Sequence, residues 1–273
     1  MYDLVNEELF DLKKSQEYIL SIQVSLSGFS FSVICPADNK LLAFKTTQLK
    51  NPDEESFTQQ FEEWFDSHEI FLNSFKKIRI IVFSENFSLV PEKFISEEIK
   101  RNVQTLLFSE KANTEVTERH MKLLDSKLIF GVPKGLKDLL KQKLKSYQLI
   151  HPIELIIRNL PDTTEKYGLA LLFNSKNLYV VLSSDNSIRL VNCFKINHPN
   201  DVIYHALASL KQSDFSPKKT EIYYSGEIDN EKEILTQFEK YFYSVKPLSG
   251  KKLLELNSED SNQLVHRNLT LYY

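Results

Sequence analysis

The apolar residues near the start of the chain follow the alternating pattern of β-strands. Every second residue from Leu20 to Leu26 is apolar, and after Ser27-Gly28 the apolar positions shift by one, running from Phe29 to Cys35. Such a parity change across a Ser-Gly pair is typical of a tight turn between antiparallel strands. Turn-forming residues at 36–39 precede a third apolar segment at 41–44. The pattern therefore predicts a three-stranded meander.

Two helices and a buried strand are expected next. Asn51-Pro52-Asp53 carries the proline and the acidic residue that favour a helix start. The stretch 78–83, which is apolar except for Arg79, predicts a buried strand, and a second helix is expected over 96–108. The residues expected to face inward are Phe57, Phe61, Trp64 and Phe65 in the first helix, and Ile99, Val103 and Leu106 in the second.

The stretch before the middle of the chain predicts two strands and two more helices. The strands are expected within 112–133, and the second one ends at Pro133. The segment 134–146 predicts a helix with leucines on one face and lysines around the rest. Such a helix packs its leucines and leaves its lysines in water, or it docks on a membrane surface or a partner. His151-Pro152 starts a short helix, and the turn-forming residues 161–164 are the expected linker.

The second half of the chain repeats the pattern of the first. Strands are expected at 168–173, 178–182, 188–191 and 221–226, with helices after His198-Pro199 and over 229–243, and the final residues NLTLYY read as a strand or a docked tail. When the first half is shifted by 147 residues, about thirty positions align without a gap. Val33 then falls on Val180, Asp38-Asn39 on Asp185-Asn186, and Pro52 on Pro199.

A βββαβα unit used twice resembles the ground plan of the actin-like ATPase superfamily, in which each half is a ribonuclease-H-like domain. The opening YILSIQVSLSGFSFSVICPADNKLLAFKT (18–46) resembles a Bacteroidota family of unknown function that has this fold. The resemblance implies an α/β protein with mixed sheets and helices on both sheet faces. It predicts two tandem ribonuclease-H-like halves, residues 1–162 and 163–273, with a nucleotide cleft between them.

The same resemblance locates three candidate nucleotide-binding turns. In the superfamily, the first two turns contact phosphate and carry aspartate and glycine, and a third turn, near the adenosine, carries a glycine pair. Here the first turn keeps its glycine but has no carboxylate, and the second has neither an acid nor a glycine. The candidate cofactor-binding residues are Ser25, Ser27 and Gly28 in the first turn, Asn174 and Ser175 in the second, and Ser225 and Gly226 in the third.

The sequence is compatible with three functions. Phosphoryl transfer depends on positioned charge, so the missing acids favour a non-catalytic binding or scaffold protein with a degenerate nucleotide cleft. The alternative is an ATP-binding enzyme, or a nucleotide-dependent switch, that uses other residues of the cleft, with ATP and Mg²⁺ as its ligands. A third reading is a filament-forming or membrane-associated relative. No catalytic or metal-binding residue is assigned from the sequence.

Composition narrows the partners and the compartment. The net charge is −3 and few basic residues are arginine, which argues against nucleic acid and leaves an unknown protein partner. The two cysteines form no disulfide framework, so a cytoplasmic location is expected. No apolar run reaches the length of about 18 residues that a transmembrane segment needs. The histidines lack metal-binding spacing, and His151 and His198, each before a proline, are expected to cap helices.

Overall fold

A computed structural model describes residues 3–5, 10–49, 56–108, 113–161, 167–227, 230–248 and 268. The expected helix start at 51–53, the linker residues 162–164 and the expected strand or tail at the end of the chain lie outside these residues, apart from position 268. Within the described part, no helix combines the length and the apolar character that crossing a membrane requires. The chain divides into two compact units, the first running to Pro152 and the second beginning at Ile153.

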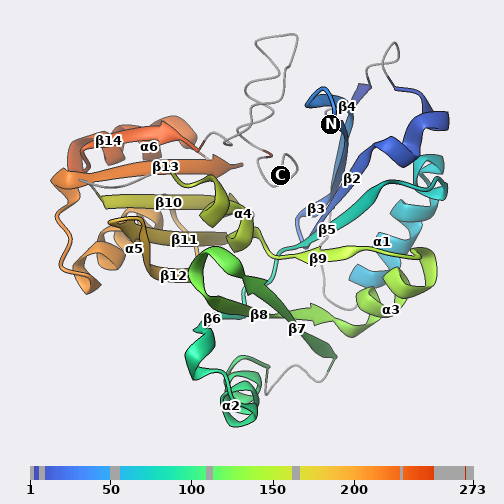
Figure 1. Ribbon diagram of the computed structural model, residues 1–273. Helices are drawn as coiled ribbons and strands as arrows, with labels where there is room; N and C mark the ends of the chain where they lie inside the picture. The colour runs from blue at the N-terminus through green and yellow to red at the C-terminus, as the bar shows by residue number, and fades with distance from the viewer. Residues whose placement is uncertain are drawn as a thin grey trace. The chain divides into compact units, whose positions relative to one another are not determined.

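The first unit is built on a mixed sheet with the strand order β1-β4-β3-β2-β5-β9 (Figure 1). The strands β1 to β4 pair antiparallel, whereas β2, β5 and β9 run parallel. The predicted meander is therefore confirmed, and the short strands β1 and β9 are additions to the prediction. The strand bounds are β1 Asp3–Val5, β2 Ile19–Ser25, β3 Gly28–Cys35, β4 Lys40–Gln48, β5 Lys77–Val82 and β9 Gln148–Ile150.

Helix α1 (Phe57–Asp66) covers this sheet with the aromatic face that the spacing predicted. The ring of Phe61 packs edge-on against Phe29 of β3 at 5.2 Å, and the Trp64 indole nitrogen donates to Thr47 Oγ1 at 3.1 Å. Helix α3 (Lys134–Lys143) buries its leucines, and its Lys143 contacts Asp66 of α1 at 2.7 Å. The lysine-rich helix is therefore a packed helix of the first unit. Short 3₁₀ segments lie at η1 Leu12–Glu17 and η2 Glu69–Leu72.

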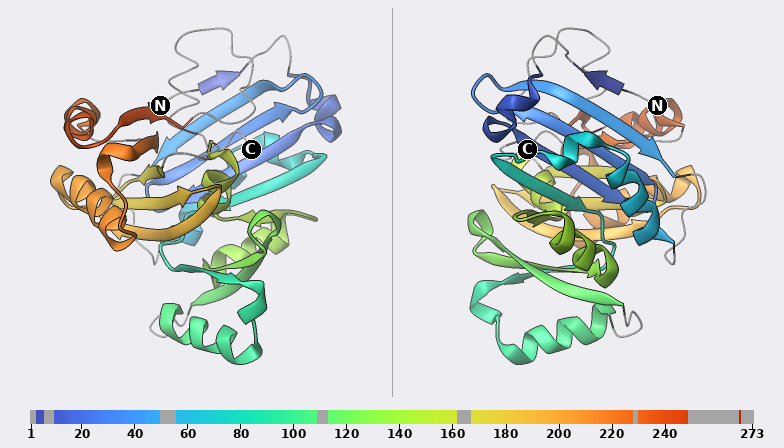
Figure 2. Two further views of the ribbon diagram at one scale, coloured as in Figure 1. Left: turned by 60° about the vertical axis from the view of Figure 1, so that its left-hand side comes forward. Right: turned by 90° about the vertical axis from the view of Figure 1, so that its right-hand side faces the viewer.

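A second, smaller sheet belongs to the same unit, with the strand order β6-β8-β7 (Figure 2). Its elements are β6 Phe87–Pro91, η3 Glu92–Phe94, α2 Glu97–Phe108, β7 Thr114–Met121, η4 Lys122–Leu124 and β8 Ser126–Pro133. Strand β6 was not expected. In α2 the expected inward position of Leu106 is wrong, since its side chain is 82% exposed. The half-buried face runs through Ile99, Val103 and Leu107 at intervals of four residues, and every residue of α2 keeps some exposure.

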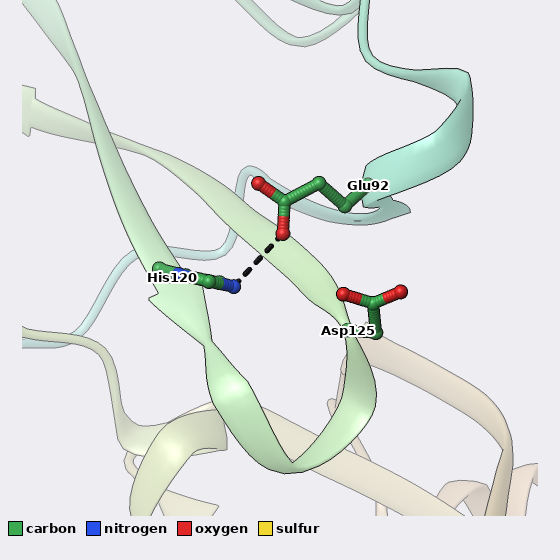
Figure 3. A group of neighbouring side chains, drawn as sticks. All are labelled: Glu92, His120 and Asp125. Atoms are coloured by element: carbon green, nitrogen blue, oxygen red, sulfur yellow. Dashed lines mark ion pairs between the residues drawn. The ribbon is translucent and has the colours of Figure 1, made fainter.

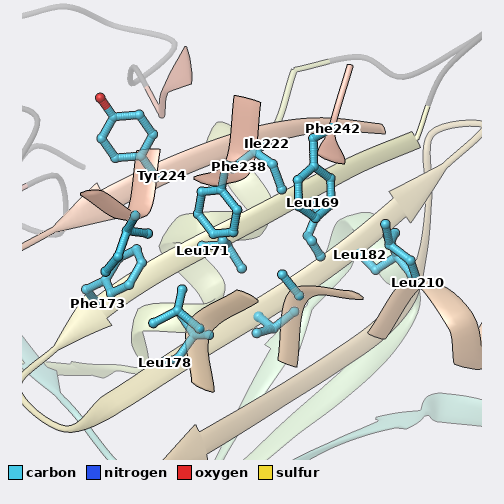
Figure 4. Close-up of a cluster of buried hydrophobic side chains, with 14 residues drawn as sticks. Leu169, Leu171, Phe173, Leu178, Leu182, Leu210, Ile222, Tyr224, Phe238 and Phe242 are labelled. Atoms are coloured by element: carbon cyan, nitrogen blue, oxygen red, sulfur yellow. The ribbon is translucent and has the colours of Figure 1, made fainter. Parts of the chain in front are cut away.

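The second unit has one mixed sheet with the order β12-β11-β10-β13-β14. Helices α5 and α6 cover one face of it, and Figure 4 shows Phe238 of α6 and Phe242, directly after α6, over Leu169, Leu171 and Ile222. The edge strand β14 was not expected. The bounds are α4 Pro152–Asn159, β10 Tyr167–Asn174, β11 Asn177–Ser184, β12 Ser187–Lys195, α5 Pro199–Gln212, η5 Pro217–Lys219, β13 Thr220–Gly226, α6 Glu231–Tyr241 and β14 Ser244–Pro247.

The two units share one strand arrangement, because β4-β3-β2-β5-β9 and β12-β11-β10-β13-β14 have the same order and directions. The gapless alignment is wrong for the first hairpin, however. A β-bulge follows Val33 in the first unit and Leu182 in the second, a shift of 149 residues. In β4, by contrast, Ala43 corresponds to Leu190, the predicted shift of 147.

Turn length explains this difference. The β3–β4 turn spans 36–39, between the paired residues Cys35 and Lys40, whereas the β11–β12 turn spans only 185–186. An error of two residues preserves which side chains face the core, since the strand period is two. The alignment could therefore match Val33 with Val180 and still keep the hydrophobic pattern.

Candidate functional site

The first candidate turn connects β2 to β3 and is closed by its own hydrogen bonds. The buried Ser25 hydroxyl donates to the Gly28 carbonyl at 3.1 Å and lies 2.7 Å from the Ser27 hydroxyl. The Ser27 carbonyl accepts from Leu49 N at 3.0 Å, which ties the turn to the end of β4. The Ser25 side chain is therefore directed into the turn, and its proton is engaged there.

Gly28 is required by the strand geometry at this turn. Its φ is +154°, and a Cβ at this position would overlap the carbonyl oxygen of Thr47 on the adjacent strand β4. Gly28 pairs with Gln48 in the β3–β4 ladder, so the close approach is a property of the sheet itself. The glycine that resembles a phosphate-loop glycine thus has a purely structural reason to be present.

The second turn, between β10 and β11, repeats the backbone contact of the first. The Lys176 carbonyl accepts from Ile196 N at 2.7 Å, as the Ser27 carbonyl accepts from Leu49 N. Lys176 therefore corresponds to Ser27, and Asn177 takes the place of Gly28. Asn174 is half-buried, and Ser175 is exposed at a φ of +52°. This turn offers an amide, a hydroxyl and a lysine ammonium, all of which can donate hydrogen bonds.

The third candidate pair ends β13, next to the second turn. Ser225 and Gly226 pair with Leu172 and Phe173 in the parallel β10–β13 ladder. The structure thus brings the four candidate residues of the second unit to one sheet edge, where the carboxyl ends of parallel strands bind ligands in open α/β folds. Ser225 is fully buried, and Gly226 has φ +94°, where a Cβ would overlap the Phe173 carbonyl oxygen.

His151, which directly precedes α4, is a buried residue of the core. Its side chain is fully buried, its Nε2 lies 2.9 Å from the Ser84 carbonyl oxygen, and its ring contacts Phe87 and Phe130 at 4.6 and 5.1 Å. Because a carbonyl only accepts, Nε2 carries the proton. Burial lowers the pKa of His151 to about 4, against the opposing effect of the Ser84 contact, so the ring is neutral. His198 does cap α5, accepting from Asn200 N at 3.1 Å.

A polar group on the β13–β14 edge was missed in the sequence. The Glu221 carboxylate accepts from Tyr223 Oη at 2.5 Å, from Lys246 Nζ at 3.2 Å and from Ser244 Oγ at 3.3 Å. Burial, with Glu221 as acceptor, raises the pKa of Tyr223, so this phenol stays protonated. The alternation in Glu221-Ile222-Tyr223 could have indicated that the two polar side chains share a face. These bonds join β14 to β13 and leave the carboxylate satisfied.

A second missed group consists of Glu92, His120 and Asp125, in the small sheet. Their potential ligand atoms all lie within 4.8 Å of one another. Glu92 is distant in sequence from His120 and Asp125, and the three follow no metal-binding spacing, so only strand pairing reveals the group. None of the three residues belongs to a candidate nucleotide-binding turn.

Comparison with known proteins agrees with this architecture. A family model described as "Protein of unknown function (DUF3822)" matches residues 7–245. The chain is similar to a Bacteroides thetaiotaomicron protein with actin-like ATPase fold and unknown function, at 20% identity and TM-score 0.79, over 94% of this chain and 98% of that one.

Two further structures show the same fold at lower similarity. One is a chain from a PilM–PilN type IV pilus biogenesis complex, at 9% identity and TM-score 0.53, over 93% of this chain and 96% of that one. The other is the ethanolamine utilization protein EutJ of Carboxydothermus hydrogenoformans, at 7% and 0.50, over 98% and 93%. No curated protein matches the sequence. The predicted actin-like ATPase fold is thereby confirmed.

Proposed function

Because the chain belongs to the DUF3822 family and has an actin-like ATPase fold, we propose that it is a non-catalytic binding or scaffold protein. Its candidate phosphate turns lack the carboxylates that phosphoryl transfer requires. The observation that carries this proposal is the absence of a carboxylate from both phosphate turns, 25–28 and 173–177. Transfer of a phosphoryl group needs a metal ion held by carboxylates, and neither turn supplies one.

The local geometry of the turns supports the same proposal. The Ser25 hydroxyl donates within its own turn, and both retained glycines are explained by neighbouring strands. The features that resemble a phosphate site therefore have reasons that need no ligand. We infer that selection for the fold, and not for ATP turnover, accounts for Gly28 and Gly226.

We propose that the ligand of this binding protein is another protein. The similar chain from the PilM–PilN complex indicates that a protein of this fold is part of a multi-protein assembly, which supports a binding role here. The proposed compartment is the cytoplasm, since Cys35 and Cys193 are thiols and are not joined in a disulfide.

Nucleotide binding as a switch is the second candidate. The observation that favours it is the exposed pair Ser175 and Lys176, next to the end of β13. A lysine ammonium and a turn hydroxyl are donors that phosphate oxygens accept. Binding at this place would need no carboxylate, although hydrolysis would.

Thermal melting with ATP and with ADP, each with Mg²⁺, separates the two candidates. A nucleotide at a hundred times its Kd would stabilise the protein by about 2.7 kcal/mol, which is a rise in Tm of several degrees. The proposal predicts no rise. The switch is supported instead if the wild type rises, Lys176→Ala abolishes the rise, and the control Lys211→Ala on the exposed surface of α5 retains it.

A further inference from the structure

Three potential metal ligands meet at one end of the small sheet (Figure 3). Glu92 directly follows β6, His120 is the penultimate residue of β7, and Asp125 directly precedes β8. The His120 Nε2 lies 2.9 Å from Glu92 Oε2, and Figure 3 shows Asp125 beside this pair. Each ligand thus comes from the end of a different strand of one sheet.

Strand pairing fixes the backbone of all three residues. Pro91 pairs with Ser126 and His120 pairs with Lys127, so β8 holds both neighbouring strands in register. The Glu92 backbone nitrogen also donates to the Asp125 carbonyl at 2.8 Å. A site whose ligands stand on paired strands is more precisely positioned than one on loops alone.

We propose that Glu92, His120 and Asp125 bind a divalent transition-metal cation, with Zn²⁺ as the best match. One imidazole and two carboxylates are a set of ligands that zinc accepts, at bond lengths of roughly 2.0–2.2 Å. Two such ligands on a tetrahedral ion lie about 3.4 Å apart. The existing ligand atoms, all within 4.8 Å of one another, reach this arrangement by small side-chain rotations.

Two nearby lysines have partners outside this group. Lys127 contacts Glu118 at 3.2 Å, and Lys93 lies over the Phe94 ring at 4.9 Å. Two carboxylates balance the charge of a divalent ion, and water completes its coordination, because all three side chains are at least partly exposed. An imidazole ligand favours zinc, cobalt or nickel over Mg²⁺ and Ca²⁺, which prefer oxygen ligands. This site is therefore independent of the Mg²⁺ that an ATP site would bind.

The competing explanation is a simple ion pair between His120 and Glu92. An exposed pair of this kind contributes little to stability and does not involve Asp125. The two explanations therefore differ in what a substitution of Asp125 does. Asn at this position preserves the left-handed backbone of Asp125, at φ +45°, because asparagine tolerates that conformation.

The test is titration of the tag-free full chain with Zn²⁺ by calorimetry, and with Co²⁺ by visible absorption. We expect one saturable site that excess Mg²⁺ does not displace. Since losing a residue that merely supports a ligand costs about 10–100-fold in affinity, losing a ligand in His120→Ala or Asp125→Asn should cost at least about 100-fold. His198→Asn removes an imidazole outside the group and keeps a side chain that can cap α5. Glu118→Gln removes a nearby carboxylate that is not a proposed ligand. Both variants should bind Zn²⁺ with the affinity of the wild type.

Two results would overturn the proposal. One is the lack of saturable Zn²⁺ or Co²⁺ binding by the wild type. The other is unchanged affinity in Asp125→Asn, or an equal loss in Glu118→Gln, since either would show that Zn²⁺ binds by general charge or through other residues. Melting curves of each variant without metal show whether it is folded, and His120 and Asp125 are exposed enough to be replaced without disturbing the core.

Discussion

Replacing Gly226 by alanine tests whether the glycine of the third turn serves the fold. Gly226 ends β13 at φ +94° and pairs with Phe173 of β10. An L-residue at positive φ costs about 1–2 kcal/mol. The new Cβ would also overlap the Phe173 carbonyl oxygen, and relieving that overlap weakens a buried ladder contact by about 1–3 kcal/mol. We therefore expect Gly226→Ala to destabilise the protein by roughly 2–5 kcal/mol.

Gly135→Ala in α3 is the matched control for this substitution. Its Cβ would meet the Thr58 side chain, whose Oγ1 lies 2.9 Å away and can rotate, and not the backbone. Alanine is also a better helix former than glycine by about 1 kcal/mol, so the net change should stay within about 1 kcal/mol. The identical substitution is thus expected to have very different effects at the two positions.

Urea denaturation followed by circular dichroism measures both variants, and hydrogen exchange of the β10 and β13 amides locates the effect. We expect a lower midpoint for Gly226→Ala and faster exchange in β10 and β13. The reasoning is refuted if Gly226→Ala is as stable as the wild type. If that stable variant also lost a nucleotide-dependent rise in Tm, the glycine would serve a ligand and not the sheet.

Two further predictions concern the cores of the units. The buried neutral His151 has its pKa lowered from 6.5 to about 4, so the unfolded chain binds its proton first as the pH falls. The unfolding free energy should therefore be intact above pH 6.5 and decline by roughly 3 kcal/mol as the pH falls to 4. In urea titrations at several pH values, His151→Gln should show a weaker dependence of the unfolding free energy on pH. The same pH dependence in the variant and the wild type would contradict this prediction. Phe238→Ala should lower the unfolding free energy by about 3–5 kcal/mol, because the ring is fully buried in the core of the second unit; a loss below 1 kcal/mol would contradict this packing.

The periodicity of hydrophobic residues was sufficient to predict the long helices and strands of the fold. The meander, the aromatic face of α1 and the capped start of α5 each depend on local signals, namely alternation, i/i+4 spacing and the residues of a capping box. Strands of three to five residues, such as β9, β6 and β14, carry too few positions for alternation to be recognised. Their existence depends on pairing with a neighbour.

The internal repeat also shows that hydrophobic periodicity does not determine strand register. A shift of 147 matched hydrophobic positions on both sides of the β3–β4 turn, although the hairpin before it is shifted by 149. Periodicity cannot distinguish registers that differ by two residues, whereas the β-bulges after Val33 and Leu182 can. In α2, three apolar residues were expected inward, but the exposure of Leu106 in the structure shows that its side chain faces away from the core.

The sequence was sufficient to locate some of the candidate site residues but not the contacts that explain them. The turn positions could be located from the sequence because each follows a recognisable strand, yet the reason for Gly28 lies in Thr47, nineteen residues later, across the β3–β4 pair. The group of Glu92, His120 and Asp125 has no sequence signature, since its members meet only through the register of three strands. Interactions that depend on long-range pairing are the ones that one sequence leaves undetermined.

Isothermal titration of the full chain with ATP and Mg²⁺, with phosphate release followed in the same sample, tests the central claim most directly. The missing carboxylates of turns 25–28 and 173–177 lead us to expect neither saturable heat nor released phosphate. Micromolar binding with measurable phosphate release would contradict the account and would show that other residues of the fold supply the chemistry.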